Sequence, residues 1–393
     1  MLSLSQVLSF AATALYSGMW WLRWVRTGQK NKMWPMLGWF SGLICVGSVA
    51  GVVAWVANMQ RNTLAQDSMS PGITRRQTYV LYAQNSRWLA ALFAFYPVEF
   101  LCLIIPKLML LGRLASNAMR CSRAQIPGVS SNGHGWCSAR LLLSIYRAMA
   151  AAVLLCGIAV MCAYFVDVEY CARTAVTQDS AAAACDAQGG ETISSLALYN
   201  NRSNVAAGTA FAAENGSEAI ALLIVSFAYV VFVSISVTIF RRTERVAAHA
   251  LESMSSHLQV VSNLQSERMA AIVDDTMHAA AEQRRRLVSA CVVVLLSFPI
   301  RASYAVMNAY SVDPQSNPAC GSCDACQSDQ WLIRVWISHT PEFQPIVVAL
   351  SSPLPLSLSL WLITSAHARA LAIAHDMQVS SIRPGALQVH AAP

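Results

Sequence analysis

Seven stretches of the sequence are apolar over the length of about 20 residues that an α-helix needs to cross a membrane. A bilayer offers no hydrogen-bond partners to the backbone, so segments of this kind are helical inside it. The composition agrees, because only 12% of the residues are charged, whereas a soluble domain has about 25%. The expected spans are residues 2–22, 34–57, 88–111, 143–165, 219–240, 288–309 and 343–364.

These runs predict an all-α membrane protein, a seven-transmembrane helix bundle over residues 1–366. The segments between the spans are too short to fold as a domain with its own core. The composition therefore argues against an ordinary soluble enzyme. It also argues against a nucleic-acid-binding protein, because there is no soluble domain that could bind a nucleic acid. We expect a multi-pass protein of the plasma membrane or a secretory-pathway membrane. Its tail, residues 367–393, should be cytosolic and mostly disordered.

The basic residues predict the orientation of the bundle, because Lys and Arg favour cytosolic loops. With the N-terminus outside, 19 of the 27 Lys and Arg residues lie in or near inside loops, and seven lie in or near outside loops. This distribution predicts an outside N-terminus and a cytosolic C-terminus. The exception is segment 58–87, whose four arginines fall on the outer side.

Two of the connecting segments differ in their expected structure. Segment 241–287 contains no Pro and no Gly and has apolar residues every three or four positions, which predicts helix. We expect helical cytosolic extensions of spans five and six, with a break near Ser262 and Asn263; the alternative is a solvated, frayed linker. Segment 166–218 is rich in Ala, Ser and Asn, and we expect a partly disordered outside loop there.

Glu99 in span three and Arg301 in span six are ionisable residues inside the expected bilayer. Such residues are costly in hydrocarbon and normally face a partner or a water-filled cavity. Their depths from the outer side, roughly 16 and 10 Å, are close enough for long side chains to meet. We therefore expect an intramembrane charge pair. It could act as a ligand anchor, a proton relay or a conformational latch. It could also fix the helix register, or Glu99 could be protonated and bonded to another neighbour.

Several spans contain proline, which removes a backbone hydrogen bond and bends a helix. The candidate hinges are Pro97 in span three, Pro299 in span six, and Pro353 and Pro355 in span seven. A hinge, or a break that lines a cavity, is one interpretation. A static kink that improves packing is the other.

The expected outside loops carry two kinds of modification signal. Asn201 and Asn215 begin Asn-x-Ser tripeptides, which are acceptors for glycosylation. An oxidising compartment favours disulfides among the outside cysteines, and no complete set of four metal ligands occurs locally, so we predict neither a metal nor a cofactor. The disulfide candidates are Cys171, Cys185, Cys320, Cys323 and Cys326.

A small-residue face in span two lets another helix approach closely. It is formed by Gly38, Gly42, Gly47 and Gly51. Packing inside the bundle is one interpretation, and homodimerisation through this face is the other.

Two arginine clusters flank the expected cytosolic arms. They could anchor lipid headgroups or face a cytosolic signalling protein. The arginines concerned are Arg241, Arg242, Arg245, Arg284, Arg285 and Arg286.

The expected architecture resembles that of the G-protein-coupled receptors. The shared features are seven spans, an outside N-terminus, a glycosylatable loop after span four and long helical arms between spans five and six. The resemblance is one of topology, because the signature motifs of the rhodopsin-like members are absent: span three is followed by Leu111-Gly112-Arg113-Leu114, and span seven contains Ser352-Pro353-Leu354-Pro355. It implies signalling through movement of spans five and six.

Three functions remain open on this evidence. The first is a divergent seven-transmembrane receptor-like protein that signals to a cytosolic partner. The second is a transporter or channel with Glu99 and Arg301 on a polar pathway. The third is a membrane scaffold that docks a cytosolic protein on the arms of 241–287. We find no catalytic motif in the sequence and expect no enzyme.

Overall fold

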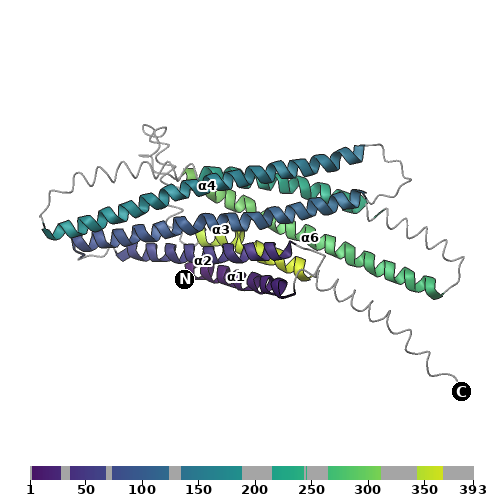
Figure 1. Cartoon of the computed structure of the whole chain (residues 1–393), viewed down its shortest axis with the longest axis horizontal. Coiled ribbons are helices and arrows are strands. Elements are labelled where there is room, and N and C mark those ends of the chain that lie inside the picture. The colour runs from purple at the N-terminus through teal and green to yellow at the C-terminus, as the bar shows by residue number, and fades with distance from the viewer. Residues whose placement is uncertain are drawn as a thin grey trace, which may run out of the picture. The chain divides into compact units, whose positions relative to one another are not determined.

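The computed structural model describes residues 2–27, 36–67, 73–123, 134–187, 215–242, 245, 264–310 and 343–365. All regular secondary structure within these residues is helical, as predicted. Two helices without a label are named here by their residues, helix 215–242 and helix 353–365. The other helices are α1 (Leu2–Thr27), α2 (Leu37–Asp67), α3 (Arg75–Arg123), α4 (His134–Ala187), α6 (Leu264–Tyr310) and α8 (Phe343–Ser351). Figure 1 shows them in the colours of their place in the sequence.

Six helical segments in the described part of the chain are long and apolar enough to cross a membrane. The protein is therefore a helical multi-pass membrane protein. The number of seven spans, the orientation of the termini and the kind of membrane stay predictions. The six segments are Leu37–Leu64, Arg76–Asn117, Leu143–Ala183, Asn215–Arg242, Ala281–Met307 and Ile346–Ser365.

The helix over the first predicted span, α1, is not one of these six. Its buried face carries Gln6 and Ser17, which are 1% and 0% exposed. Its outer face carries Leu8 and Leu15, which are 59% and 71% exposed. A helix on the surface of a soluble protein shows the opposite pattern. The exposed leucines of α1 therefore suit a lipid environment.

The small-residue face of α2 contacts other helices of the same chain. A Cβ atom added to Gly51 would lie 2.6 Å from the ring of Phe10 in α1, and one added to Gly47 would lie 2.8 Å from Leu103 in α3. The other two glycines of this face, Gly38 and Gly42, are covered by tryptophan side chains of α1. The structure thus shows this face packed against α1 and α3 of the same chain, and homodimerisation stays a prediction.

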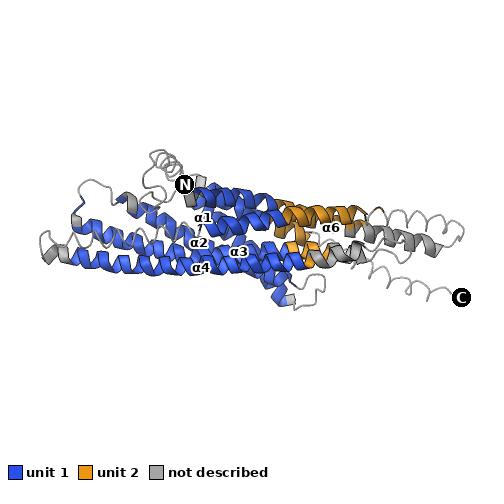
Figure 2. Ribbon diagram, turned by 90° about the horizontal axis from the view of Figure 1, so that it is seen from above, with its two compact units in different colours: residues 1–110, 144–228, 294–357 blue, residues 111–143, 229–293, 358–393 orange. Residues whose placement is uncertain are grey.

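The chain divides into two compact units, shown in Figure 2. Unit 1 contains α1, α2, most of α3 and α4, the first half of helix 215–242, the end of α6, and α8. Unit 2 comprises residues 111–143, 229–293 and 358–393. The buried charges described below all belong to unit 1.

In unit 1, two of the expected loops are largely helical. The described part of segment 58–87 is almost entirely helical, because α2 continues to Asp67 and α3 begins at Arg75. The start of α3 is capped reciprocally: the Thr74 backbone N–H donates to Gln77 Oε1 at 2.9 Å, and the Gln77 N–H donates to Thr74 Oγ1 at 3.4 Å. Thr-x-x-Gln is the sequence signature of such a capping box. The sequence therefore contains a signal for the start of α3 at this position.

The expectation of a partly disordered loop over 166–218 is wrong for its first part, since α4 is helical to Ala187. Residues 166–187 contain seven alanines and neither Pro nor Gly, so their intrinsic helix propensity is high. The extension also contacts α3. Ser86 donates to the Gln178 side chain at 3.2 Å, and Arg87 pairs with Asp179.

The second predicted arm is present as helix, because α6 is continuous from Leu264, directly after Asn263, into the sixth span. Of the first arm, the structure describes Arg241, Arg242 and Arg245. The rest of that arm and the tail 367–393 lie outside the described residues.

Candidate functional site

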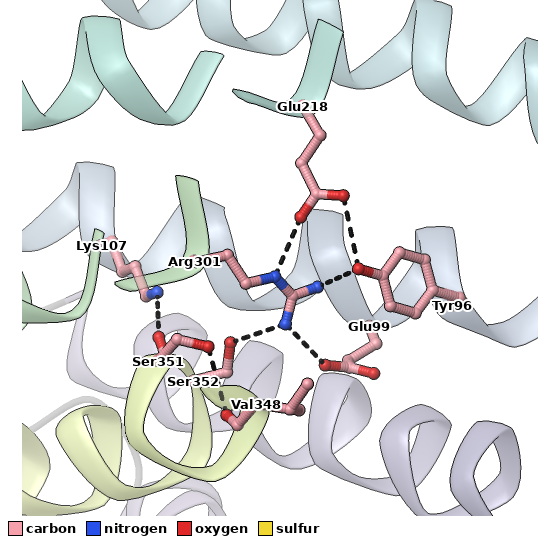
Figure 3. A network of polar contacts seen from close by, with 8 residues as sticks. All are labelled: Tyr96, Glu99, Lys107, Glu218, Arg301, Val348, Ser351 and Ser352. Carbon is pink, nitrogen blue, oxygen red and sulfur yellow. Dashed lines mark hydrogen bonds and ion pairs between the residues drawn. The ribbon is translucent and has the colours of Figure 1, made fainter. Parts of the chain in front are cut away.

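A buried network of polar side chains surrounds Arg301 in unit 1 (Figure 3). The Nε of Arg301 donates to Glu218 Oε1 at 2.9 Å, and its Nη2 donates to the hydroxyl of Tyr96. That hydroxyl in turn donates to Glu218 Oε2 at 3.3 Å. The Nη1 of Arg301 lies 3.5 Å from Ser352 Oγ and 3.9 Å from Glu99 Oε1. One guanidinium from α6 thus reaches side chains of helix 215–242, α3 and the turn after α8.

These charged groups are sealed inside the protein. Arg301 is 4% exposed, Glu218 is 2% exposed and Glu99 is 0% exposed. The guanidinium also lies over the ring of Tyr96, 5.2 Å from its centroid. Taking an ion out of water costs several kcal/mol, which only close pairing and hydrogen bonding offset. Arg301 therefore depends on Glu218 and Tyr96 to remain buried.

The structure brings Glu99 and Arg301 together, as the sequence predicts, but Glu218 is the closer carboxylate. At 3.9 Å, Glu99 Oε1 is within ion-pair distance of Arg301 and beyond hydrogen-bond distance. Neither carboxylate oxygen of Glu99 accepts a hydrogen bond from the described residues. Glu99 is thus the incompletely bonded member of the network.

Sequence reasoning missed Glu218, because it precedes the predicted fifth span by one residue and was counted with the outside loop. A usable signal is present in Asn215-Gly216-Ser217-Glu218. An Asn followed three residues later by Glu, just before an apolar run, is a helix-start pattern. It predicts a helix that begins at Asn215, where the described helix does begin. That start carries Glu218 into the bundle.

Lys107 is a second buried cation that the sequence did not single out. It is 5% exposed, and its Nζ donates to the backbone carbonyl of Ser351 at 2.9 Å and lies 4.9 Å from the ring centroid of Phe298. In a regular helix that carbonyl would accept from the N–H of residue 355. Pro355 has no N–H to donate. Lys107 therefore bonds the carbonyl that Pro355 leaves without its helical partner.

The predicted hinge prolines fall into two groups. Pro353 and Pro355 lie at a one-residue turn, because α8 ends at Ser351, Ser352 forms the turn, and the next helix starts at Pro353. Helical backbone bonds continue on both sides of it, from the Ser352 N–H to the Val348 carbonyl at 3.1 Å and from the Leu356 N–H to the Ser352 carbonyl at 3.4 Å. Pro97 and Pro299 lie inside the continuous helices α3 and α6. Motion at these positions stays a prediction. Both cations of the network reach the turn at Ser352: Lys107 bonds the Ser351 carbonyl, and Arg301 lies 3.5 Å from the Ser352 hydroxyl.

The predicted modification sites find little support. Asn215 is 6% exposed at the start of helix 215–242, where a glycan would have no room, and Asn201 lies outside the described residues. Cys171 is a buried free thiol in α4. Cys185 lies 14 residues further along the same helix, about 21 Å away, which is too far for a bridge between the two. Outside the described residues lie the other candidates, Cys320, Cys323 and Cys326.

Among the described residues, no group of three or more His, Cys, Asp or Glu side chains could hold a metal ion. The network itself offers two carboxylates and two cations, with Arg301 and Lys107 already bonded to protein oxygens. This arrangement suits charge pairing, proton binding and conformational switching.

The arginines proposed to face a partner lie in unit 2 and differ in their contacts. Arg286 donates to Glu282 and to Ser365, both at 2.6 Å. Arg284 lies over the ring of Phe240 at 5.9 Å. Contacts within the chain thus occupy these two side chains. The exposed members are Arg241, Arg242, Arg245 and Arg285.

Comparison of the chain with protein-family models, with curated proteins and with solved structures finds no match. The fold and the site together define a helical multi-pass membrane protein with a buried charge network. No family is shown beyond that class.

Proposed function

We propose that the protein is a receptor-like membrane protein in which Arg301 holds α6 in one position and releases it on activation. We call Arg301, Glu218 and Tyr96 the Arg301 latch. The observation that carries this proposal is that one buried side chain of α6 bonds both helix 215–242 and α3. The contact is closed and buried, with its two charged partners 5% and 2% exposed at their side chains. A closed pair of this kind favours a latch over an open polar pathway.

The energetics of such a latch favour two discrete states. A buried ion pair that loses one partner costs about 3–5 kcal/mol unless a new partner replaces it. Glu99, 3.9 Å from Arg301, is the nearest alternative carboxylate within the network. Exchange of Arg301 between Glu218 and Glu99 would shift α6 relative to helix 215–242. Packed interfaces of this kind tend to be bistable.

A continuous helix, α6, can transmit a displacement of Arg301 to other parts of the protein. Arg286 and Arg301 are 15 positions apart in the continuous helix α6, a distance of about 22 Å. Near the Arg286 end, the exposed arginines of unit 2 offer positive charge to a cytosolic protein with an acidic surface. The topological resemblance to G-protein-coupled receptors supports this direction of signalling.

The test replaces Glu218 by Gln in the full-length protein. Genetically encoded spin labels at the exposed positions 147 in α4 and 285 in α6 report their separation in lipid nanodiscs. Opening of the latch should broaden and lengthen the distance distribution. In parallel, the purified protein is assayed for stimulated nucleotide exchange on a panel of heterotrimeric G proteins.

The matched control is Arg87→Gln, which breaks an exposed ion pair of the same unit. It should leave the distance distribution and nucleotide exchange unchanged. An unaltered distribution in a well-folded Glu218→Gln variant would contradict the latch. A changed distribution without exchange on any G protein would keep the latch and remove that class of partner.

A transporter is the second candidate, and the interrupted helix at Ser352 favours it. Broken helices beside buried charges occur at the midplane binding sites of secondary transporters. On this reading Glu99 would carry a proton or bind a cation during transport. Flux in proteoliposomes that disappears in Glu99→Gln would support transport, and its absence across protons, alkali cations and small organic ions would remove it.

A further inference from the structure

Seven residues of unit 1 carry buried polar atoms that have no hydrogen-bond partner among the described residues. Four of the seven are Trp55 (Nε1) in α2, Glu99 and Asn85 (Oδ1) in α3, and Asp167 (both carboxylate oxygens) in α4. We call these four residues the polar seam. Asp167 is 2% exposed and Trp55 is 2% exposed, so bulk water does not reach them.

Contacts between α3 and α4 order the seam along the bundle. Tyr164 of α4 packs against the ring of Tyr96 at 5.5 Å, one turn from Glu99. Asp167 follows Tyr164 by three residues and so lies on the same face of α4. Further along, Ser86 of α3 bonds Gln178 of α4, beside Asn85. Asp167 thus lies between the Arg301 latch and the end of unit 1 where α2 and α3 are joined.

Contacts of α2 place Trp55 at a matching level. Gly47 faces Leu103 of α3. Trp55 is eight residues beyond Gly47 along α2, which is about 12 Å. Moving the same distance along α3 from Leu103 toward its start leads to Phe95, the residue before Tyr96. The seam therefore begins at the latch and leads through Trp55 and Asp167 toward Asn85.

Buried polar groups without a partner are rare in proteins. Where several occur together, ordered water supplies the missing hydrogen bonds, with two to four polar partners for each molecule. We propose that ordered water fills the polar seam and delivers protons from the α2–α3 end of unit 1 to Asp167 and Glu99. The ligand of this site is the proton. Binding forms one O–H bond on a carboxylate oxygen while one O–H bond of a protonated seam water breaks, which leaves neutral water, and no electrons are transferred.

The charged and titratable neighbours of each carboxylate set its response. Glu99 faces Arg301, with Glu218, Lys107 and Tyr96 in the same network. Proton uptake at Glu99 cancels its attraction for Arg301 and leaves Glu218 as the remaining anionic partner. Protons would then favour the closed latch, a consequence that rests on the proposed function.

Asp167 has different neighbours. Cys171, one turn along α4, is in electrostatic contact with Asp167 and with Arg61 of α2. Neither the thiol nor the guanidinium hydrogen-bonds the carboxylate oxygens of Asp167. Asp167 is accordingly placed as an intermediate proton acceptor between Glu99 and the α2–α3 end.

The test is infrared difference spectroscopy of the full-length protein in lipid vesicles, recorded across steps of pH. Protonation of a buried carboxylate produces a C=O stretching band that is separate from those of solvated carboxyl groups. The wild type should show two such bands, one lost in Glu99→Gln and the other in Asp167→Asn. Transfer to D₂O should shift both bands within minutes, because seam water exchanges its protons.

Glu169→Gln is the matched control, since Glu169 is two residues from Asp167 and its side chain is 64% exposed. It should remove neither band. The wild-type measurement needs no variant, so a variant that fails to fold leaves the proposal testable. Absence of pH-dependent buried carboxyl bands in the wild type, or bands that resist D₂O for hours, would overturn it.

The seam and the latch can fail separately. Exchangeable bands together with an unchanged spin-label distance in Glu218→Gln would support the seam and contradict the latch. A changed distance without exchangeable bands would do the reverse.

Discussion

Two of the arginine–carboxylate pairs that join different helices of unit 1 differ mainly in burial. Arg301 and Glu218 are 5% and 2% exposed at their side chains, whereas Arg87 and Asp179 are 59% and 41% exposed. Water solvates the exposed pair whether it is formed or broken, so its net contribution is small. The buried pair has no solvated alternative. The same chemistry can therefore control the conformation in one place and be dispensable in the other.

The largest expected effect comes from removing the buried cation. Arg301→Gln leaves Glu218 buried without its partner and should lower the free energy of unfolding by about 3–5 kcal/mol. Thermal unfolding of the purified protein in detergent measures the loss. A loss below about 1 kcal/mol would equal the contribution of an exposed ion pair. It would contradict the claim that burial makes the Arg301–Glu218 pair more important for stability.

A smaller loss is expected at the broken helix. Lys107→Met leaves the Ser351 carbonyl without a donor and should cost about 1–3 kcal/mol. The matched background is Pro355→Ala, which restores an N–H where a regular helix would bond that carbonyl. Lys107→Met should cost less in this background, and the coupling is read from the double-mutant cycle. Equal costs in both backgrounds would contradict the role assigned to Lys107.

The smallest effect is expected for the exposed pair. Arg87→Gln should change the free energy of unfolding by at most about 1 kcal/mol, and any change should shrink as salt is added. A loss of stability that approaches that of Arg301→Gln and persists in high salt would show that the exposed pair of Arg87 and Asp179 contributes as much as the buried one.

The sequence predicted the class of fold and part of the site. Runs of apolar residues revealed the spans, and two ionisable residues among them, Glu99 and Arg301, pointed to the network. Glu218 and Lys107 were missed because both lie near the ends of predicted spans, where charged residues usually reach water. Their burial depends on how far the helices extend and which faces meet. Hydropathy along the chain reports neither.

The part of α4 formed by residues 166–187 shows a second reason why sequence patterns alone were insufficient. Residues 166–187 are polar enough to be taken for a loop, yet their alanines favour helix and the neighbouring α3 supplies partners such as Ser86 for Gln178. The capping signature at Thr74 was readable in the sequence. The contact between the two helices was not.

The sequence by itself determined that this chain is helical and embedded in lipid, because each span contains its own apolar side chains and satisfies its own backbone. The tertiary structure alone decided that Arg301 binds Glu218 more closely than Glu99, and that Lys107 reaches the carbonyl left without a donor by Pro355. Those outcomes depend on side chains from helices far apart in the sequence meeting in three dimensions. Local sequence pattern and composition do not predict such contacts between distant helices.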